Sequence, residues 1–157
     1  MEELLHIRLA TIEDAKMLFE WRNDEETRRA SGTTALLDWD KHVQWLEKVL
    51  SGGFPGRTLH IVETGAGEPI GTMRSDERDD GFVEVSYTIA PFWRGKGMGK
   101  CMVLQFVHEK LAGRKIVAHI KKDINPASEA IARALGLAPF SEVSSDEPKE
   151  PPMVEWR

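Results

Sequence analysis

Residues 90–102 read APFWRGKGMGKCM, with glycines at every second position from 95 to 99 and basic side chains at Arg94, Lys96 and Lys100. The apolar residues that follow predict a helix that begins inside this stretch. The first N–H groups of a helix have no partner within the helix, and the macrodipole adds about half a positive charge at that end. Glycines let a ligand approach the backbone closely because they have no Cβ. The stretch therefore predicts a seat for a phosphate or another anion.

Two common phosphate motifs do not fit this spacing. A P-loop needs four residues between its first glycine and Gly-Lys-Ser/Thr, whereas here Cys101 follows Lys100 where a metal-binding hydroxyl is required. A dinucleotide fingerprint is GxGxxG at the first strand–helix turn of a parallel unit. The pattern here is GxGxG, and it follows strands that we expect to be antiparallel. The stretch is therefore neither a P-loop nor a dinucleotide fingerprint.

The segments around this stretch alternate between strand and helix patterns. Upstream, the sequence predicts a strand at 4–9, a helix at 12–23, a loop at 24–37, a helix at 38–50 and a meander of strands at 58–63, 70–74 and 82–90. Downstream, it predicts a helix up to 111, a strand at 116–120, a helix at 125–136, a loop from 142 and a final strand at 153–156. This order is typical of an α/β fold with helices on both faces of one mixed sheet, and we expect a single domain, 1–157.

Composition narrows the function classes. The net charge is −5, from 21 basic and 26 acidic residues, so we expect no nucleic acid partner. The first ten residues lack a basic region before a long apolar run, and no run approaches about 18 apolar residues, so we expect no signal peptide and no membrane partner. The single cysteine, Cys101, fits a reducing cytoplasm, and the five histidines show no metal-ligand spacing. We therefore expect a cytoplasmic chain without a metal.

Four segments of the chain resemble the GNAT superfamily of N-acetyltransferases. Arg94, Gly97 and Gly99 fit its signature Arg/Gln-x-x-Gly-x-Gly/Ala, which binds the pyrophosphate of acetyl-CoA. IRLATIEDAKMLFEWRND (7–24) is similar to the first strand and helix of these enzymes. EPIGTMRSDERDDGFVEVSYTIAP (68–91) is similar to their central strands, and NPASEAIARALGL (125–137) to their late helix that begins at an asparagine. The resemblance covers nearly the whole chain and implies acetyl-CoA as co-substrate.

The resemblance also implies which residues hold acetyl-CoA. Backbone amides would bind the pyrophosphate, at Gly95, Lys96, Gly97, Met98, Gly99 and Lys100. Arg94 would add a charge-assisted contact, unless it is simply solvated. The pantetheine arm would extend the sheet along Thr88, Ile89 and Ala90. Asn125 and Ser128 would contact the cofactor, although an asparagine before Pro126 is also a good helix cap, and the two roles can coexist.

Alternation along 82–90 places Glu84, Ser86 and Thr88 on one face of that strand. Carboxylates are rarely buried unless they are paired, so a glutamate in a central strand indicates a paired or functional group. Glu84 resembles the strand glutamate that serves as base in several relatives. An ion pair or a substrate contact is the alternative. The family tyrosine that protonates the leaving thiolate is replaced by Ala132. Either another group serves, or the thiolate leaves unaided, because a thiol pKa of about 8.5 makes it a good leaving group.

Three other polar side chains in the predicted strands are weaker candidates for a functional role. Tyr87 is expected in the core, on the face opposite Glu84, and the strand histidines His60 and His119 are expected to pack or to lie on the surface, with a site role as the minor alternative.

The acceptor is expected to contact the N-terminal third, at Trp21, Arg22, Asn23 and Arg28. This segment resembles the branch that acetylates nucleotide-linked amino sugars and also the ribosomal-protein N-terminal branch. We expect acetyl transfer to an amino sugar or another small-molecule primary amine by direct attack in a ternary complex. The alternatives are a protein N-terminal acetyltransferase and a non-catalytic acetyl-CoA-binding sensor. The sequence is compatible with a homodimer.

Overall fold

The computed structural model describes residues 4–31, 35–143 and 151–157. Its strands form one seven-stranded sheet in the order β1-β2-β3-β4-β5-β7-β6. These strands are β1 (His6–Leu9), β2 (Arg57–Glu63), β3 (Pro69–Glu77), β4 (Phe82–Ile89), β5 (Lys115–Lys121), β6 (Pro139–Val143) and β7 (Met153–Trp156). Neighbouring strands are antiparallel except β4 and β5, which are parallel. The predicted mixed sheet and its central meander are confirmed.

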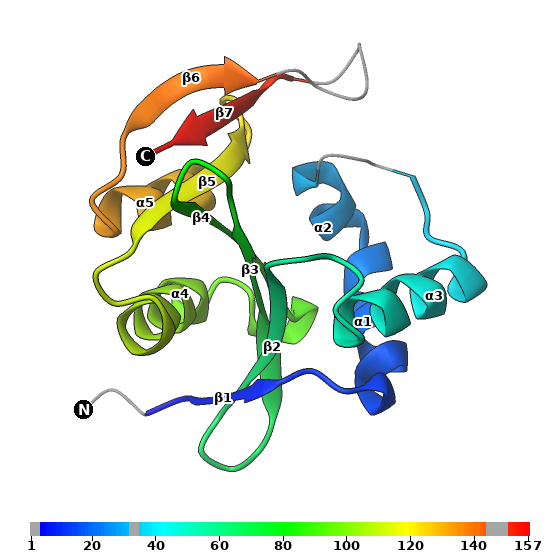
Figure 1. The fold of residues 1–157 in the computed structure, drawn as a ribbon. Helices are drawn as coiled ribbons and strands as arrows, with labels where there is room; N and C mark the ends of the chain where they lie inside the picture. Colours follow the sequence, from blue (N-terminus) through cyan, green and yellow to red (C-terminus); the bar gives the residue numbers. More distant parts are fainter. Residues whose placement is uncertain (1–3, 32–34, 144–150) are drawn as a thin grey trace.

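Helices cover both faces of the sheet, as predicted (Figure 1). One face carries α1 (Ala15–Asn23), α2 (Glu25–Ala30) and α3 (Trp39–Leu50), and the other carries α4 (Met98–Lys110) and α5 (Pro126–Ala134). Two short 3-10 turns, η1 (Ile12–Asp14) and η2 (Pro91–Trp93), precede α1 and α4. Among the described helices, none is both long enough and apolar enough to cross a membrane.

The alternating pattern of the strands divides the core into two layers. On the α4 side, Val83 and Val85 of β4 pack in one cluster with Met102 and Phe106 of α4. On the α1 side, a second cluster joins apolar residues of α1, α3 and β2, namely Leu18, Trp21, Leu46, Leu59 and Ile61. Because successive side chains of a strand point to opposite faces, Glu84 lies on the α1 side, away from the first cluster.

One glycine is required where β3 crosses α4. A Cβ at Gly71 would lie 2.4 Å from the carbonyl oxygen of Thr88 and 2.8 Å from the sulfur of Met102. Both contacts are too short for a Cβ, so α4 can pack this closely against β3 only because residue 71 has no side chain. The close packing brings the beginning of α4 next to the end of β4.

Local signals set the helix ends where the sequence predicts them. The Thr11 N–H donates to the Asp14 carboxylate at 2.8 Å, as expected of a capping box. Asp38 accepts from the Lys41 N–H at 3.1 Å and begins α3. Asn125 accepts from the Ser128 N–H at 3.2 Å and begins α5, with Pro126 in the first position. The predicted helices therefore start at their capping residues.

Three expectations about element bounds are wrong in part. The loop expected at 24–37 contains α2, whose first turn is capped by Asp24; residues 32–34 lie outside the described part. β3 extends to Glu77, beyond the expected end at 74. β6 was not expected; it begins at Pro139, before the expected tail loop, and overlaps that loop only at Glu142 and Val143. Residues 144–150 of the expected loop lie outside the described residues.

The sheet opens between β4 and β5. The two strands pair in parallel only at Phe82, Val83 and Glu84 of β4. From Ala118 onward, β5 pairs with β7. The second half of β4 is thus left without β5 as a partner, and this open edge leads directly to the Gly-rich stretch.

Candidate functional site

The Gly-rich stretch has the geometry expected of the predicted anion seat, at the N-terminus of α4. Gly95 and Gly97 both have left-handed backbone conformations, with φ of 72° and 75°, and Gly97 is the residue that caps α4. A Cβ at either glycine would meet no protein atom within 4 Å, so the space beside the loop is open. Alternating conformations of this kind turn successive N–H groups toward one point and create a concave anion site.

The amide groups of this loop are available to a ligand. Within the described residues, the N–H groups of six consecutive positions donate to no protein acceptor, and these positions are Gly95, Lys96, Gly97, Met98, Gly99 and Lys100. Buried or partly covered N–H groups are almost always paired in folded proteins. Six free donors at a helix N-terminus therefore fit a group with several anionic oxygens, such as a pyrophosphate.

Arg94 was predicted to contact a phosphate, but in the structure its side chain binds residues of the protein. Its guanidinium binds the Asp24 carboxylate, lies 2.9 Å from Glu26 and donates to the Thr27 hydroxyl at 2.7 Å. The hydrogen bond from Arg94 lowers the pKa of Asp24. The side chain therefore ties α2 to the anion seat. The positive charge that remains beside the seat comes from Lys96, whose ammonium lies over the Phe92 ring at 3.9 Å, and from Lys100.

The open edge of β4 is built from alternate residues. The Ala90 N–H donates to the Ile70 carbonyl at 2.8 Å, so the backbone groups of Ala90, and by alternation those of Thr88, face β3. The backbone groups of Tyr87 and Ile89 face the opposite edge, where β5 is not paired. Of the three predicted pantetheine contacts, Ile89 thus has outward-facing backbone groups. Tyr87 was expected only as a core residue.

Tyr87 and Ser128 meet on the α5 side of this opening. The Tyr87 hydroxyl lies 2.5 Å from the Ser128 hydroxyl, in the first turn of α5. Burial raises the pKa of the Tyr87 phenol, so it stays protonated at neutral pH. Asn125 caps this turn through its side-chain oxygen, which confirms its structural role. Ala132, at the family tyrosine position, is buried one turn further along.

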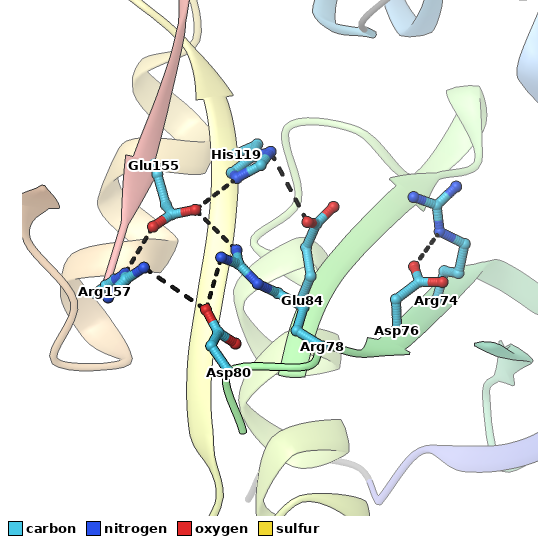
Figure 2. A network of polar contacts seen from close by, with 8 residues as sticks. All are labelled: Arg74, Asp76, Arg78, Asp80, Glu84, His119, Glu155 and Arg157. Carbon is cyan, nitrogen blue, oxygen red and sulfur yellow. Dashed lines mark hydrogen bonds and ion pairs between the residues drawn. The ribbon is translucent and has the colours of Figure 1, made fainter. Parts of the chain in front are cut away.

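Glu84 lies on the opposite face and belongs to a polar network that spans three strands (Figure 2). Its Oε1 is 3.9 Å from Nδ1 of His119 on β5, and His119 Nε2 is 3.0 Å from Oε1 of Glu155 on β7. Glu155 also accepts from Arg78 at 2.8 Å and from Arg157 at 2.6 Å. These hydrogen bonds outweigh burial and lower the pKa of Glu155 to about 2. Glu84 is one-quarter exposed, so it is accessible from this face.

The four predicted acceptor residues have different environments. Trp21 is buried in the core beneath α3. Asn23 uses its side chain to accept from the Leu37 N–H at 2.6 Å, and Arg28 Nε donates to the Asn23 carbonyl at 3.1 Å. Both therefore shape the segment after α1. Arg22 is different: its guanidinium lies 3.9 Å above the Trp45 ring and contacts Nδ1 of His42 at 3.0 Å.

Arg22 has cations rather than carboxylates around it. No carboxylate of the described residues forms an ion pair with Arg22. Burial, followed by the charges of Arg74 and Arg57, lowers its pKa to about 10. Arg57 and Arg74 share one carboxylate, Asp76, at 2.6 and 3.0 Å. Three guanidiniums thus lie near one another on the face that carries Glu84, and two of them share a single acid.

The family of the chain follows from its match to a family model. Residues 5–138 match the family model described as acetyltransferase (GNAT) domain. This chain belongs to the GNAT acetyltransferase family. The chain is therefore an N-acetyltransferase, the class of enzyme that the resemblance of the Gly-rich stretch implied. No curated protein sequence matches the chain.

Solved structures of other GNAT enzymes share the fold. Spermidine N-acetyltransferase from Vibrio cholerae, in complex with CoA and spermine, superposes with a TM-score of 0.82 at 16% identity, covering 97% of this chain and 93% of that one. Ribosomal-protein-alanine N-acetyltransferase from Brucella melitensis has a TM-score of 0.75 at 23% identity, covering 96% and 97%. AAC(6')-Ib in complex with ribostamycin and coenzyme A has a TM-score of 0.77 at 21% identity, covering 97% and 91%.

Sequence reasoning missed several polar residues of the site face. Glu155, Arg57 and Arg74 were not singled out, although Glu155 stands between Val154 and Trp156 in a short final strand, which is the same signal that drew attention to Glu84. His119 was expected to pack or to lie on the surface, with a site role only as the minor alternative. No group of three or more potential ligands able to hold a metal occurs in the described ranges.

Proposed function

We propose that this chain transfers the acetyl group of acetyl-CoA to a primary amine by direct attack in a ternary complex. The observation that carries this proposal is the row of six free amide N–H groups beside the open edge of β4. Such a seat fits the pyrophosphate, while the outward backbone groups of Tyr87 and Ile89 fit the amides of the pantetheine arm in the manner of an added strand. The thioester would then lie in the opening between β4 and β5.

Glu84 is proposed as a catalytic residue that binds the acceptor's amine and helps to deprotonate it. An alkylammonium with a pKa near that of lysine, about 10.4, is almost fully protonated at neutral pH, so a proton acceptor is needed before attack. Glu84 is partly exposed on the face that carries α1 to α3. Its place on β4, beside the open part of the same strand, supports this role.

The Tyr87–Ser128 pair is proposed to donate a proton to the leaving thiolate in place of the missing family tyrosine. The pair contains two hydroxyl groups but only one hydrogen bond between them. Whichever hydroxyl donates within the pair, the other keeps an O–H that the described residues do not use. That spare donor, on the α5 side of the opening, supports the assignment.

The acceptor is proposed to be a small-molecule amine that carries an anionic group, such as a nucleotide-linked amino sugar. Arg22, Arg57 and Arg74 supply three cations against the one carboxylate of Asp76. Asp76 lies opposite Glu84 in the register of β3 and β4, so the arginines that share this carboxylate lie on the same face of the sheet as Glu84. This excess of positive charge disfavours a polyamine.

A panel of amines tests the acceptor class. A UDP-linked amino sugar should be acetylated with a higher kcat/KM than glucosamine, spermidine or a peptide that begins with alanine. Arg74→Gln should raise the KM for the anionic acceptor by about 10- to 100-fold, the value of one lost charge-assisted hydrogen bond, and leave glucosamine unaffected. Arg114→Gln, which removes an exposed ion pair with Glu77, is the matched control. Preferred turnover of spermidine would contradict the acceptor class.

Two other functions remain as alternatives. The likeness to a ribosomal-protein-alanine N-acetyltransferase at 23% identity favours a protein N-terminus as acceptor. In that case the alanine peptide, rather than the anionic sugar, should be the best substrate of the panel. Ala132 at the family tyrosine position favours a non-catalytic acetyl-CoA sensor. Tight binding of acetyl-CoA without turnover of any amine would support that function.

A further inference from the structure

Glu155 fixes the orientation of His119. The Glu155 carboxylate is almost completely buried and receives hydrogen bonds from Arg78, Arg157 and His119. Its pKa of about 2 keeps it ionised at every pH at which the protein would work. An ionised carboxylate can only accept hydrogen bonds. The imidazole nitrogen that faces it, Nε2, must therefore carry a hydrogen.

The opposite nitrogen of His119 is left with a lone pair. In a neutral imidazole, a hydrogen on Nε2 makes Nδ1 the acceptor. Nδ1 faces Oε1 of Glu84 across 3.9 Å, which is too long for a direct hydrogen bond. Figure 2 shows both groups on the same side of the strands, with the free end of Glu84 turned toward the ring. Two proton acceptors thus converge on one small space without a donor from the described residues between them.

Other histidines show what a structural role looks like in this fold. His42 has a partner at each ring nitrogen, the Ala15 carbonyl at 2.8 Å and Arg22 at 3.0 Å. His60 is buried against Phe106, and burial lowers the pKa of its imidazole. His119 differs from both histidines. Its Nε2 is hydrogen-bonded to Glu155, whereas its Nδ1 faces the accessible carboxylate of Glu84.

We propose that His119 is a second catalytic residue, which binds the acceptor's ammonium group together with Glu84 and takes its proton at Nδ1. An ammonium has three N–H donors, so one can point to each of the two acceptors while the third is free. This inference rests on the proposed amine acetylation and adds the residue that receives the proton. Glu155 is the positioning residue, because it sets which nitrogen faces the acceptor.

The proton balance of the reaction follows from this arrangement. The acceptor loses one proton to His119 and becomes a neutral amine. Its lone pair forms the C–N bond, the C–S bond breaks, and the second nitrogen proton ends on the CoA sulfur, directly or by way of the Tyr87 pair. The imidazolium that His119 becomes lies between two carboxylates, Glu84 and Glu155, and returns its proton to solvent.

The charged groups that face His119 define the pH dependence to expect. Glu155 of β7 contacts the ring and Glu84 of β4 faces it at 3.9 Å, while Arg78 and Arg157 reach it only through Glu155. Because the base is needed only while the acceptor is protonated, His119→Gln should lower kcat/KM by about 10²-fold or more at neutral pH. The deficit should shrink as the pH rises toward the pKa of the amine.

The test compares wild type, His119→Gln, Glu155→Gln and the control His6→Gln, which replaces an exposed histidine of β1 that pairs with Glu63 of β2. Rates are measured between pH 5.5 and 9.5 with the best amine of the panel and with an aromatic amine, which is unprotonated at neutral pH and needs no base. His119→Gln should impair the alkyl amine and spare the aromatic one. Glu155→Gln should lower kcat more than it raises KM, and all variants should bind acetyl-CoA normally in calorimetry.

A spectroscopic measurement does not depend on turnover. Nitrogen-15 NMR of the imidazole should show His119 with hydrogen on Nε2 in wild type and a mixture of tautomers in Glu155→Gln. A His119→Gln enzyme with an unchanged profile, or with the same deficit at every pH and for both amines, would overturn the role of His119 alone. If wild type binds acetyl-CoA but acetylates no amine, the proposed function fails and the catalytic role of His119 fails with it.

Discussion

Replacing Gly97 with aspartate tests the anion seat most sharply. Gly97 caps α4 in a left-handed conformation, with φ of 75°, and nothing in the protein lies within 4 Å of an added Cβ. The new side chain would therefore fit the protein itself without a clash. Its carboxylate, however, would stand beside the free N–H groups at the start of α4, where it would both repel an incoming anion and compete for its donors.

The expected losses can be separated into stability and affinity. A non-glycine residue in the left-handed region costs about 1–2 kcal/mol, and aspartate is among the residues that tolerate it best. In a chain of this size about 1 kcal/mol corresponds to a fall in Tm of roughly 2–4 °C. Loss of two charge-assisted hydrogen bonds to the pyrophosphate costs about 3–6 kcal/mol. The Kd for acetyl-CoA should therefore rise by about 10²- to 10⁴-fold.

Isothermal titration calorimetry with acetyl-CoA measures this effect, with Gly113→Asp as the matched control. Gly113 has φ of 77° and equally open space, and it lies beyond the far end of α4, about 20 Å from the seat along a 13-residue helix. Both variants carry the same strain and the same added charge. A Gly97→Asp protein whose Kd is within threefold of wild type, or equal to that of Gly113→Asp, would refute the seat.

Three further predictions concern the residues around the seat. Glu84→Gln should lower kcat most at neutral pH, with the loss shrinking toward the amine's pKa in a pH–rate profile; a constant loss would indicate a structural role instead. Tyr87→Phe should lower kcat by up to about 10²-fold at unchanged Kd for acetyl-CoA, whereas an unchanged kcat would show that the Tyr87 hydroxyl is not the proton donor. Arg94→Gln should lower Tm at pH 7, because Arg94 holds the pKa of Asp24 below its unfolded value. That stabilisation is present above the unfolded pKa of about 3.9 and is lost as the pH falls through the folded pKa, so scanning calorimetry should show a smaller difference between wild type and variant at pH 3 than at pH 7.

Strongly periodic segments and capping residues were predictable from the sequence. The meander, the helix that follows the Gly-rich stretch and the Asn125-Pro126 helix start all depend on neighbours within a few residues. α2 was missed because it contains six residues and buries none of them, so it has no apolar face to detect. Its signal is the capping residue Asp24, with acids in the first turn and arginines in the last.

The partners of the site residues were less predictable, because they come from distant parts of the chain. Arg94 is 70 residues from Asp24, and His119 is 36 residues from Glu155. The resemblance to a pyrophosphate-binding motif predicted that Arg94 contacts a phosphate. In the structure, α2 lies close enough to give Arg94 two acidic partners instead. Likewise, strand alternation indicated the face of Glu84, but only the β5–β7 pairing brings His119 and Glu155 to it.

The proposed reaction is the transfer of acetyl groups from acetyl-CoA to an amine. The most direct measurement is the release of free CoA thiol from acetyl-CoA, with and without the amines of the panel, by wild type and Gly97→Asp. We expect release by wild type that depends on an amine, and no release by Gly97→Asp at the same acetyl-CoA concentration. Tight binding of acetyl-CoA by wild type without amine-dependent release of thiol would contradict it.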